Sequence, residues 1–301
     1  MASSQNLLVA TLVANPDIGL DPARVDLAAT LLGPETKRSV LASGIAEDLI
    51  FPDPGSIKGV YNLFEAPLGD QQVDIVVQPL AHRRKRLFLA DMDSTMIGQE
   101  CIDELADYVG LKTEVAEITE RAMRGEIAFE PALRERVALL KNLPVGVVDE
   151  IITKRITLTE GGRELVQTIR ANGGYACLVS GGFTLFTGPI GAVIGFNENR
   201  ANRLLIEGEK FSGLVEEPIL GREAKRATLI ELREKLGLAA HDTMAVGDGA
   251  NDLAMLGEAG LGVAFRAKPA VAAAAHAKIE HTDLFTLLYA QGYRDDEIVR
   301  S

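Results

Sequence analysis

The chain has 301 residues, of which 47% are hydrophobic and 25% are charged, the balance of a globular rather than a disordered protein. This length suits one large domain and one small one. The formal net charge of −12 argues against a nucleic-acid-binding protein, because that function needs a basic face that neutralises phosphates.

The N-terminal segment MASSQNLLVATLVANPD lacks the charged leader and long apolar core of a targeting signal. No apolar run in the sequence approaches the roughly 20 residues of a membrane helix. The two cysteines, Cys101 and Cys177, cannot build a disulfide framework, and free thiols suit a reducing compartment. We therefore predict a cytoplasmic protein without a membrane partner.

Residues 1–84 are predicted to form a small α+β domain. Its expected elements are strands at 7–14, 40–51 and 72–80 and a helix at 21–32. Asp21-Pro22 opens that helix with an acidic cap and a first-turn proline. Pro52-Asp53-Pro54-Gly55 marks a turn. We find no catalytic motif in this domain, so its role stays open.

A basic run, His82 to Arg86, leads into the rest of the chain, and we interpret it as a solvated linker before a strand. Residues 85–301 then alternate strands with helices, which predicts a mostly parallel sheet covered on both faces. The expected strands are Arg86–Ala90, Tyr175–Val179, Thr243–Gly247, Leu261–Ala264 and Ala277–Ile279. Ligands of such sheets bind at the carboxyl ends of the strands, where polar residues follow the first three.

Two segments depart from simple alternation. Residues 106–159 carry helical runs broken at Pro131 and Pro144, and they are far longer than a crossover requires. We predict that they include an inserted helical cap over the site. Val193–Val215 alternates in hydrophobicity with turn residues between, which predicts antiparallel strands along one edge of the sheet.

The first motif, Asp91-Met92-Asp93-Ser94-Thr95, follows the first of these strands. Residues two apart in a strand point to the same side, so Asp91 and Asp93 leave the strand end as a pair. Aspartate, serine and threonine also cap helices and turns. The motif alone leaves a catalytic pair and a structural cap equally open.

The second motif, Ser180-Gly181-Gly182, follows the next strand. The glycines let the backbone approach a ligand, the following helix offers free N–H groups, and Ser180 adds a hydroxyl donor. These are the properties of a phosphate-binding turn. Serine–glycine turns are also common where no ligand binds.

The third motif is Gly247-Asp248-Gly249-Ala250-Asn251-Asp252. Two acids four residues apart around a glycine can hold a hard divalent cation through oxygen ligands. A glycine turn with one capping aspartate does not explain the Asn251-Asp252 pair, so we favour the metal site. Lys225, at the start of a predicted helix, would by itself be interpreted as solvated surface.

Taken together, the motifs and their order resemble the haloacid-dehalogenase-like superfamily of phosphotransferases, from about Lys85 to the C-terminus. Within it, the chain resembles the phosphoserine phosphatases most closely. The segments that carry this resemblance are Asp91–Thr95, Glu100–Glu104, Ala122–Phe129 with Arg136, and Gly247–Asp252. The resemblance implies an α/β Rossmannoid domain with an inserted helical cap, preceded by the small α+β domain.

The resemblance also implies a mechanism and a set of catalytic residues. Asp91 would attack phosphorus and form an aspartyl-phosphate, while Asp93 would act as general acid and then as general base. Mg²⁺ would be held by Asp91, the backbone carbonyl of Asp93 and Asp248, with support from Asp252 and Asn251. The transferring phosphoryl group would be held by Ser180, Gly181, Gly182 and Lys225, with Asn251 at the substrate.

The implied substrate is L-phosphoserine, in the last step of serine biosynthesis. By resemblance, Arg136 would pair with the substrate carboxylate and Glu100 would face its ammonium group, while Met123 and Phe129 close an apolar lid. Composition alone would make the first two surface charges and the last two cap core. Small α+β domains ahead of such enzymes bind amino acids or pair subunits in some relatives, so a homodimer is an expectation.

Three alternatives stay open at this stage. The chain could hydrolyse another small phosphomonoester, such as a sugar phosphate or a nucleotide. It could instead pass the phosphoryl group to an amino-acid hydroxyl, because hydrolysis and transfer share the covalent intermediate. A receiver-like signalling protein also uses strand-end aspartates and Mg²⁺, but an inserted cap would hide its acceptor aspartate from a partner protein.

Overall fold

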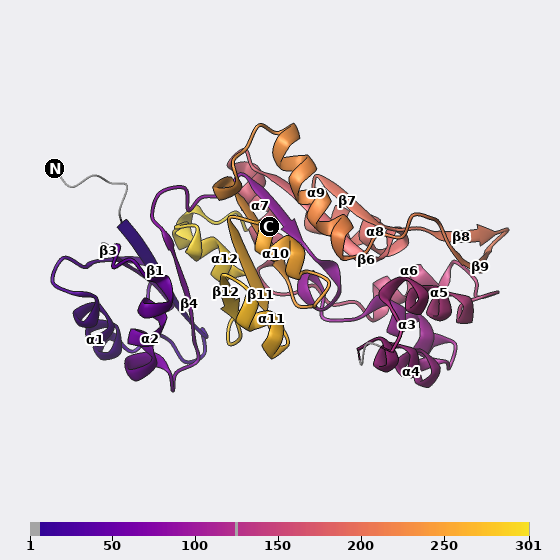
Figure 1. The fold of residues 1–301 in the computed structure, drawn as a ribbon, viewed down its shortest axis with the longest axis horizontal. Helices are drawn as coiled ribbons and strands as arrows, with labels where there is room; N and C mark the ends of the chain where they lie inside the picture. The colour runs from indigo at the N-terminus through magenta and orange to yellow at the C-terminus, as the bar shows by residue number, and fades with distance from the viewer. Residues whose placement is uncertain (1–6, 124–125, 301) are drawn as a thin grey trace.

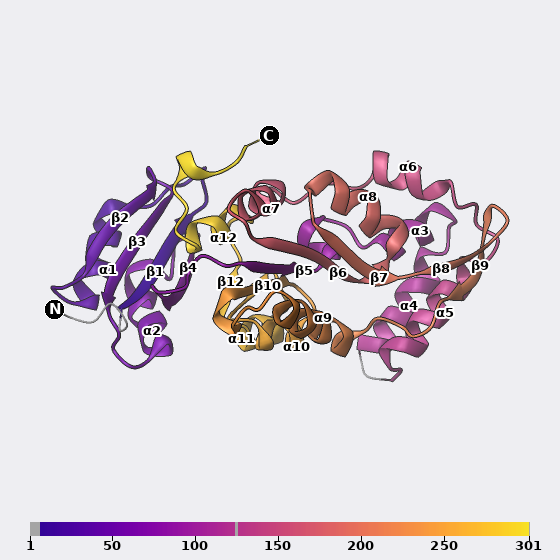
Figure 2. The same cartoon turned by 90° about the horizontal axis from the view of Figure 1, so that it is seen from above.

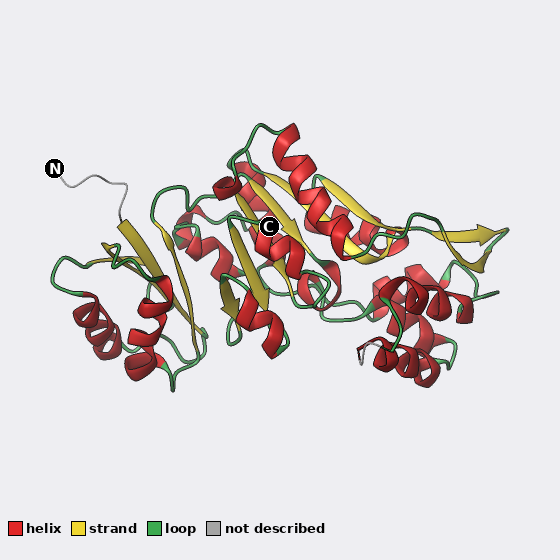
Figure 3. Ribbon diagram, viewed as in Figure 1, coloured by secondary structure: helices red, strands yellow, loops and turns green. Residues whose placement is uncertain are grey.

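The computed structural model describes residues 7–123 and 126–300 (Figure 1). An antiparallel sheet with two helices lies at one end, a parallel sheet lies in the middle, and a group of helices lies at the other end (Figures 1 and 3). This arrangement confirms the predicted α/β fold with a further N-terminal α+β unit. In the described part of the chain, no helix combines the length and the apolar character needed to cross a membrane.

The N-terminal module, residues 7–79, is a four-stranded antiparallel sheet with order β2-β3-β1-β4 and two helices on one face. Its elements are β1 (Leu7–Ala14), α1 (Pro22–Leu32), β2 (Lys37–Ala42), β3 (Ala46–Pro52), α2 (Ile57–Leu68) and β4 (Val73–Pro79). As predicted, Asp21 caps α1 by accepting a hydrogen bond from the Ala23 N–H at 2.9 Å. The single strand predicted over 40–51 was wrong, because Gly44, with φ of 69°, lies in a tight turn that divides it into β2 and β3.

The module packs against the C-terminal part of the chain through the sheet face opposite its helices. Val13, Ala46 and Val76 belong to the same apolar cluster as Leu288 of the α12 helix (Phe285–Ala290). Each buried valine or leucine side chain in this group contributes about 1.5–3 kcal/mol. The contact therefore joins the module to the central domain through a shared core.

Asp74 on β4 fixes the polar part of this contact. It is 4% exposed and accepts hydrogen bonds from the backbone N–H groups of Glu280, His281 and Thr282, at 2.8, 3.1 and 2.8 Å. The Thr282 hydroxyl donates a further bond at 2.7 Å. A buried carboxylate with this many donors is satisfied only while the module stays docked.

We expect Asp74→Asn to lower the free energy of unfolding by about 1–3 kcal/mol, because the amide offers one acceptor oxygen to four buried donors. Urea denaturation followed by circular dichroism measures the change. The matched control is Glu35→Gln, which neutralises an exposed carboxylate on the same module. Equal stability of the two variants would mean that Asp74 does not anchor the module.

The central sheet is parallel, with strand order β12-β11-β10-β5-β6-β7. Its strands are β5 (Leu87–Ala90), β6 (Tyr175–Phe183), β7 (Glu198–Asn202), β10 (Thr243–Gly247), β11 (Leu261–Phe265) and β12 (Ala277–Ile279). Leu87 and Leu89 belong to the core on one face, whereas Phe88 and Ala90 belong to the core on the other. This period of two explains why the strand is apolar throughout.

Helices cover both faces of this sheet (Figure 2). On one side lie α7 (Gly162–Ala171) and α8 (Thr184–Ile194), and on the other lie α9 (Arg222–Lys235), α10 (Leu253–Glu258) and α11 (Pro269–Ala274). The predicted alternation of strands and helices from about Lys85 is thereby confirmed.

The cap consists of α3 (Cys101–Tyr108), α4 (Lys112–Met123), α5 (Phe129–Leu139) and α6 (Val147–Lys154). Its two connections to the sheet run side by side, because Gly98 N–H donates to the Thr157 carbonyl and Thr159 N–H donates to the Met96 carbonyl, each at 3.0 Å. The predicted break at Pro131 was wrong. This proline lies in the first turn of α5, where a missing N–H costs nothing.

The prediction for Val193–Val215 was partly wrong. Residues up to Ile194 belong to α8, and β7 joins the edge of the central sheet in parallel with β6. Only β8 (Leu204–Glu207) and β9 (Lys210–Val215) are antiparallel, and they form a separate hairpin. That hairpin is bonded to the cap, where Phe211 N–H donates to the Leu143 carbonyl at 2.9 Å.

The basic run between β4 and β5 is only partly the solvated linker that we predicted, since His82, Arg84 and Arg86 are exposed but the other two residues are not. Lys85 is 7% exposed, and Arg83 pairs with the buried carboxylate of Asp48 at 2.6 Å. Arg84 pairs with Glu297 at 2.8 Å. These basic residues fasten the connection to both parts of the protein.

Candidate active site

Three aspartates converge where the central strands β5 and β10 end. Asp91 directly follows β5, Asp248 directly follows β10, and Asp252 immediately precedes α10. One carboxylate oxygen from each lies within 4.8 Å of the others. Because β5 and β10 are adjacent and parallel, their carboxyl ends meet at one edge of the sheet.

Lys225 occupies the centre of this group and is fully buried. Its Nζ lies 2.8 Å from Asp91 Oδ1 and 2.8 Å from Asp252 Oδ1. Burial opposes its charge, but the attraction of Asp252 and Asp91 outweighs burial and raises the pKa of Lys225. Solvated surface, the interpretation that Lys225 would receive by itself, is therefore wrong, and the lysine lies among the site aspartates, where the resemblance to the family had put it.

One lysine does not balance the acids around it. Burial, followed by repulsion from Asp252, raises the pKa of Asp91 well above its ordinary value and that of Asp248 to about 6. Carboxylates in this condition are stabilised by a further cation. An all-oxygen donor set suits a hard divalent ion, so Asp91, Asp248 and Asp252 fit a metal of that class.

The segment after β5 turns sharply and gives the two motif aspartates different hydrogen-bond partners. The Met92 N–H donates to Asp91 Oδ1 at 2.8 Å, which fixes the orientation of that carboxylate. Ser94 has a φ of 54°, so the backbone doubles back there. Asp93 Oδ1 accepts a bond from the Cys101 N–H at 3.3 Å. Burial and the negative charge of Glu100 raise the pKa of Asp93 to about 7.

The turn that ends β6 approaches these acids closely. A side chain at Gly182 would place its Cβ 3.0 Å from Asp93 Oδ2, and one at Gly181 would place its Cβ 3.3 Å from the Phe129 ring. The Ser180 hydroxyl accepts a bond from the Gly182 N–H at 2.9 Å. Asn251 also lies over Gly181, with its Nδ2 3.9 Å from the same Cβ position. A Cβ at either glycine would therefore be crowded, and the neighbouring side chain of Asp93 or Phe129 would have to move by a few tenths of an ångström.

The substrate-binding residues that we predicted in and beside the cap differ in how they lie relative to the site. Phe129, at the start of α5, lies over Gly181 and Gly221 and so closes the cap onto the site. Glu100 accepts a hydrogen bond from the Ser94 hydroxyl at 2.7 Å. Met123 is the last residue of α4, and its side chain, like Arg124 and Gly125, lies outside the described residues.

Arg136 lies on α5 and is half-buried beneath the cap surface. Burial lowers the pKa of its guanidinium, while the negative charges of Asp103 and Glu100 oppose that effect. Its Nε donates to the Ala132 carbonyl at 3.3 Å and its Nη1 donates to the Thr119 hydroxyl at 3.4 Å. Both acceptors are neutral oxygens, so neither of these bonds pairs the guanidinium with an anion.

Two residues at the site were missed from the sequence. Asn202 is 3% exposed and bridges two loops, donating to the Gly181 carbonyl at 2.8 Å and accepting from the Leu220 N–H at 2.6 Å. Thr95 is fully buried, and its hydroxyl lies 3.4 Å from Asp248 Oδ1. The position of Thr95 within the first motif could have indicated it, whereas a single asparagine at a strand end carries no signal.

Comparison with known proteins matches residues 88–257 to the family model of haloacid dehalogenase-like hydrolases. A phosphoserine phosphatase of Archaeoglobus fulgidus is 44% identical over 217 residues, which is 71% of this chain and 63% of that protein. The chain therefore spans less than two thirds of the length of that relative.

Two solved structures extend the comparison. A HAD family hydrolase from Salmonella enterica serovar Typhi aligns over 96% of this chain and 98% of its own, with a TM-score of 0.84 and 29% identity. A phospho-aspartyl intermediate analogue of phosphoserine phosphatase aligns over 68% of this chain and 98% of its own, with a TM-score of 0.63 and 42% identity. The first alignment includes the N-terminal module, whereas the second covers a smaller share of the chain.

Proposed function

The chain belongs to the haloacid dehalogenase-like hydrolase family, and from that premise we propose that it hydrolyses L-phosphoserine through a phosphoryl intermediate on Asp91. The observation that carries the proposal is the buried triad of Asp91, Lys225 and Asp252, joined by two contacts of 2.8 Å. It holds one carboxylate oxygen of Asp91 in place at the strand end. The relatives named phosphoserine phosphatase, and the phospho-aspartyl analogue of one of them, support the same reaction.

The first step is attack of the Asp91 carboxylate on phosphorus, which forms the aspartyl-phosphate and breaks the bond to the serine oxygen. A phosphate dianion and a carboxylate 4 Å apart repel by several kcal/mol near a protein surface, on the order of 4 kcal/mol for each pair of unit charges. Mg²⁺ held by Asp91, the backbone carbonyl of Asp93 and Asp248, with Asp252 in support, would supply the charge that removes this repulsion. Lys225 adds a fixed positive charge beside the nucleophile.

Asp93 is proposed to protonate the departing serine oxygen and then to take a proton from the water that hydrolyses the intermediate. Its carboxyl group faces Gly182, next to the phosphate-binding turn. An alkoxide is a poor leaving group, so a general acid here contributes about 10²–10⁴-fold. Ser180, Gly181, Gly182 and Lys225 are proposed to hold the phosphoryl group through hydroxyl, N–H and ammonium donors, with Asn251 at the substrate.

The cap is proposed to select the amino-acid part of the substrate. Arg136 would bind the carboxylate, since a guanidinium fork matches a planar anion, and Glu100 would face the ammonium group. Phe129 would exclude water above the phosphoryl group, together with Met123. A zwitterion needs one acidic and one basic side chain in the pocket, and Glu100 and Arg136 would supply them. By this proposal the enzyme performs the last step of serine biosynthesis.

We expect Arg136→Ala to raise KM for L-phosphoserine by about 10–100-fold, the value of a hydrogen-bonded charge at about 1.5–3 kcal/mol. Steady-state phosphate release measures the change. O-phosphoethanolamine, which lacks the carboxylate, should show little additional loss in the variant. Arg134→Ala is the matched control, because Arg134 is exposed on the same helix and pairs with Glu217 at 2.7 Å. A KM increase of equal size for both substrates would show that Arg136 does not read the carboxylate.

The substrate itself is tested by a panel containing L-phosphoserine, a sugar phosphate and a nucleotide at matched concentrations. The proposal expects kcat/KM for phosphoserine to exceed the others by orders of magnitude. A higher kcat/KM for the sugar phosphate or the nucleotide would leave Asp91 as the nucleophile but would mean that the substrate is a different small phosphomonoester. Homoserine or a similar hydroxyl acceptor is included, because a new phosphoester would identify a phosphotransferase.

A further inference from the structure

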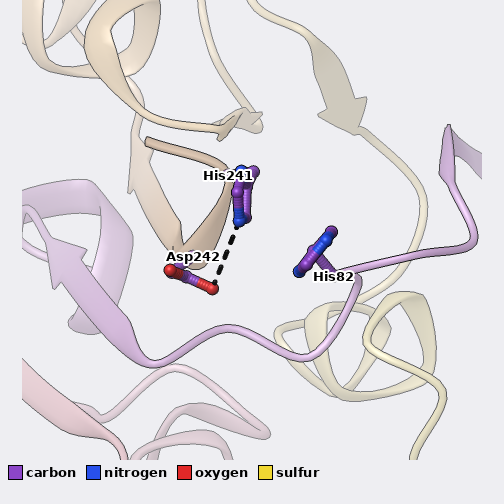
Figure 4. Close-up of side chains that lie close together, drawn as sticks. All are labelled: His82, His241 and Asp242. Atoms are coloured by element: carbon purple, nitrogen blue, oxygen red, sulfur yellow. Dashed lines mark ion pairs between the residues drawn. The ribbon is translucent and has the colours of Figure 1, made fainter. Parts of the chain in front are cut away.

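We infer that His82, His241 and Asp242 form a second metal site, distinct from the aspartate cluster and suited to zinc (Figure 4). One imidazole nitrogen from each histidine and one carboxylate oxygen of Asp242 lie within 4.8 Å of one another. His82 belongs to the linker before β5, whereas His241 and Asp242 precede β10. Since β5 and β10 are parallel, the site lies at the amino ends of these strands, opposite Asp91 and Asp248.

The backbone on both sides of the cluster is held in place. Lys85 Nζ donates to the His82 carbonyl at 3.1 Å and to the His241 carbonyl at 2.9 Å, and so ties the linker to the loop. His82 has a φ of 62°, a conformation that is uncommon for a residue with a Cβ and is kept only by its surroundings. The imidazole rings lie with their centroids 4.0 Å apart.

The donor atoms define the class of ion. The Ala239 N–H donates to Asp242 Oδ2 at 3.0 Å, while Oδ1 lies on the side of His241, 3.8 Å from its Nε2. Two imidazole nitrogens and one carboxylate oxygen form a recurrent three-residue ligand set for zinc, whereas Mg²⁺ prefers oxygen alone. His241 has a side chain that is 54% exposed, so solvent can deliver the ion and supply a fourth ligand.

The neighbouring positive charges set the expected affinity. Arg83 and Arg84 form ion pairs with Asp48 and Glu297, respectively. Lys85 attracts Asp242 and will weaken the hold of a second cation on it. We therefore expect weaker binding than at a site without a neighbouring lysine, and a structural effect: zinc would clamp the linker of the N-terminal module to the catalytic domain.

The test is isothermal titration of ZnCl₂ into untagged full-length protein that has been stripped with chelator and then saturated with Mg²⁺. Wild type should bind one zinc ion that His82→Asn and His241→Asn each weaken by about tenfold or more. The matched control is His281→Asn, because His281 is exposed and lies outside the cluster. Thermal melts without zinc check that each variant is folded.

A second measurement uses wild type alone and does not depend on variant folding. Zinc should protect His82 and His241, but not His281, from modification by diethylpyrocarbonate, as read by peptide mass spectrometry. Failure of wild type to bind zinc, binding unchanged in both variants, or equal loss in His281→Asn would overturn the site. These readouts do not involve turnover, so they are independent of the proposed phosphatase activity.

Discussion

Asp91→Asn is expected to reduce the turnover of L-phosphoserine by about 10⁴-fold or more, the scale of loss when a covalent nucleophile is removed. The asparagine amide keeps the size of the carboxylate but cannot attack phosphorus. Asp252 would still pair with Lys225 at 2.8 Å, so the buried lysine keeps one counter-ion and the fold should persist. Phosphate release under saturating Mg²⁺ measures the effect.

Two controls make this result interpretable. A thermal melt of Asp91→Asn shows whether the protein is folded, and mass spectrometry of the peptide shows whether the asparagine has deamidated back to aspartate. Asp53→Asn is the matched variant, since Asp53 is exposed in a turn of the N-terminal module, where its carboxylate accepts a bond from the Gly55 N–H. Near-normal turnover in folded, undeamidated Asp91→Asn would eliminate Asp91 as the nucleophile.

Lys225→Met should damage both catalysis and stability. Methionine fills a similar volume but leaves Asp91 and Asp252 buried without their cation. Removal of one partner of a buried ion pair lowers the free energy of unfolding by about 3–5 kcal/mol. Loss of a fixed positive charge at the phosphoryl group should lower kcat by about 10²–10³-fold.

Chemical denaturation and steady-state kinetics, each with and without Mg²⁺, separate these two effects. Because a divalent ion adds positive charge beside the same acids, Mg²⁺ should restore part of the lost stability but not the lost kcat. Lys235→Met is the control, being the same substitution at an exposed lysine at the end of the same helix. A Lys225→Met protein as stable as Lys235→Met would mean that the buried ion pairs contribute nothing to the fold.

The strand-end motifs could be predicted from the sequence because their chemistry is local. A buried strand followed at once by Asp91 or Asp248 predicts both the sheet edge and the side chains that meet there. Glycines at 181 and 182 predicted a close approach, and the structure brings Asp93 and Phe129 against them. In these segments the order of residues along the chain is enough to place the site.

Other features depend on contacts between distant segments. Lys225 by itself would be interpreted as a surface residue, and only its resemblance to the family motif pointed to the site; the packing of α9 against the sheet buries it fully. The hairpin of β8 and β9 was assigned to the sheet edge because hydrophobic alternation does not reveal which partner a strand pairs with. His82 and His241 are 159 positions apart in the chain, so no sequence window contains the cluster.

The most direct test of the proposed covalent mechanism is to identify the residue that carries the phosphoryl group during turnover. Wild-type protein is mixed with L-phosphoserine and Mg²⁺, quenched in acid, and reduced with borohydride, which converts an aspartyl-phosphate into homoserine. The account predicts homoserine at position 91, formed only with substrate and absent from Asp91→Asn. Sustained phosphate release with no trapped product at position 91, or with the phosphoryl group found on Ser180, would contradict it.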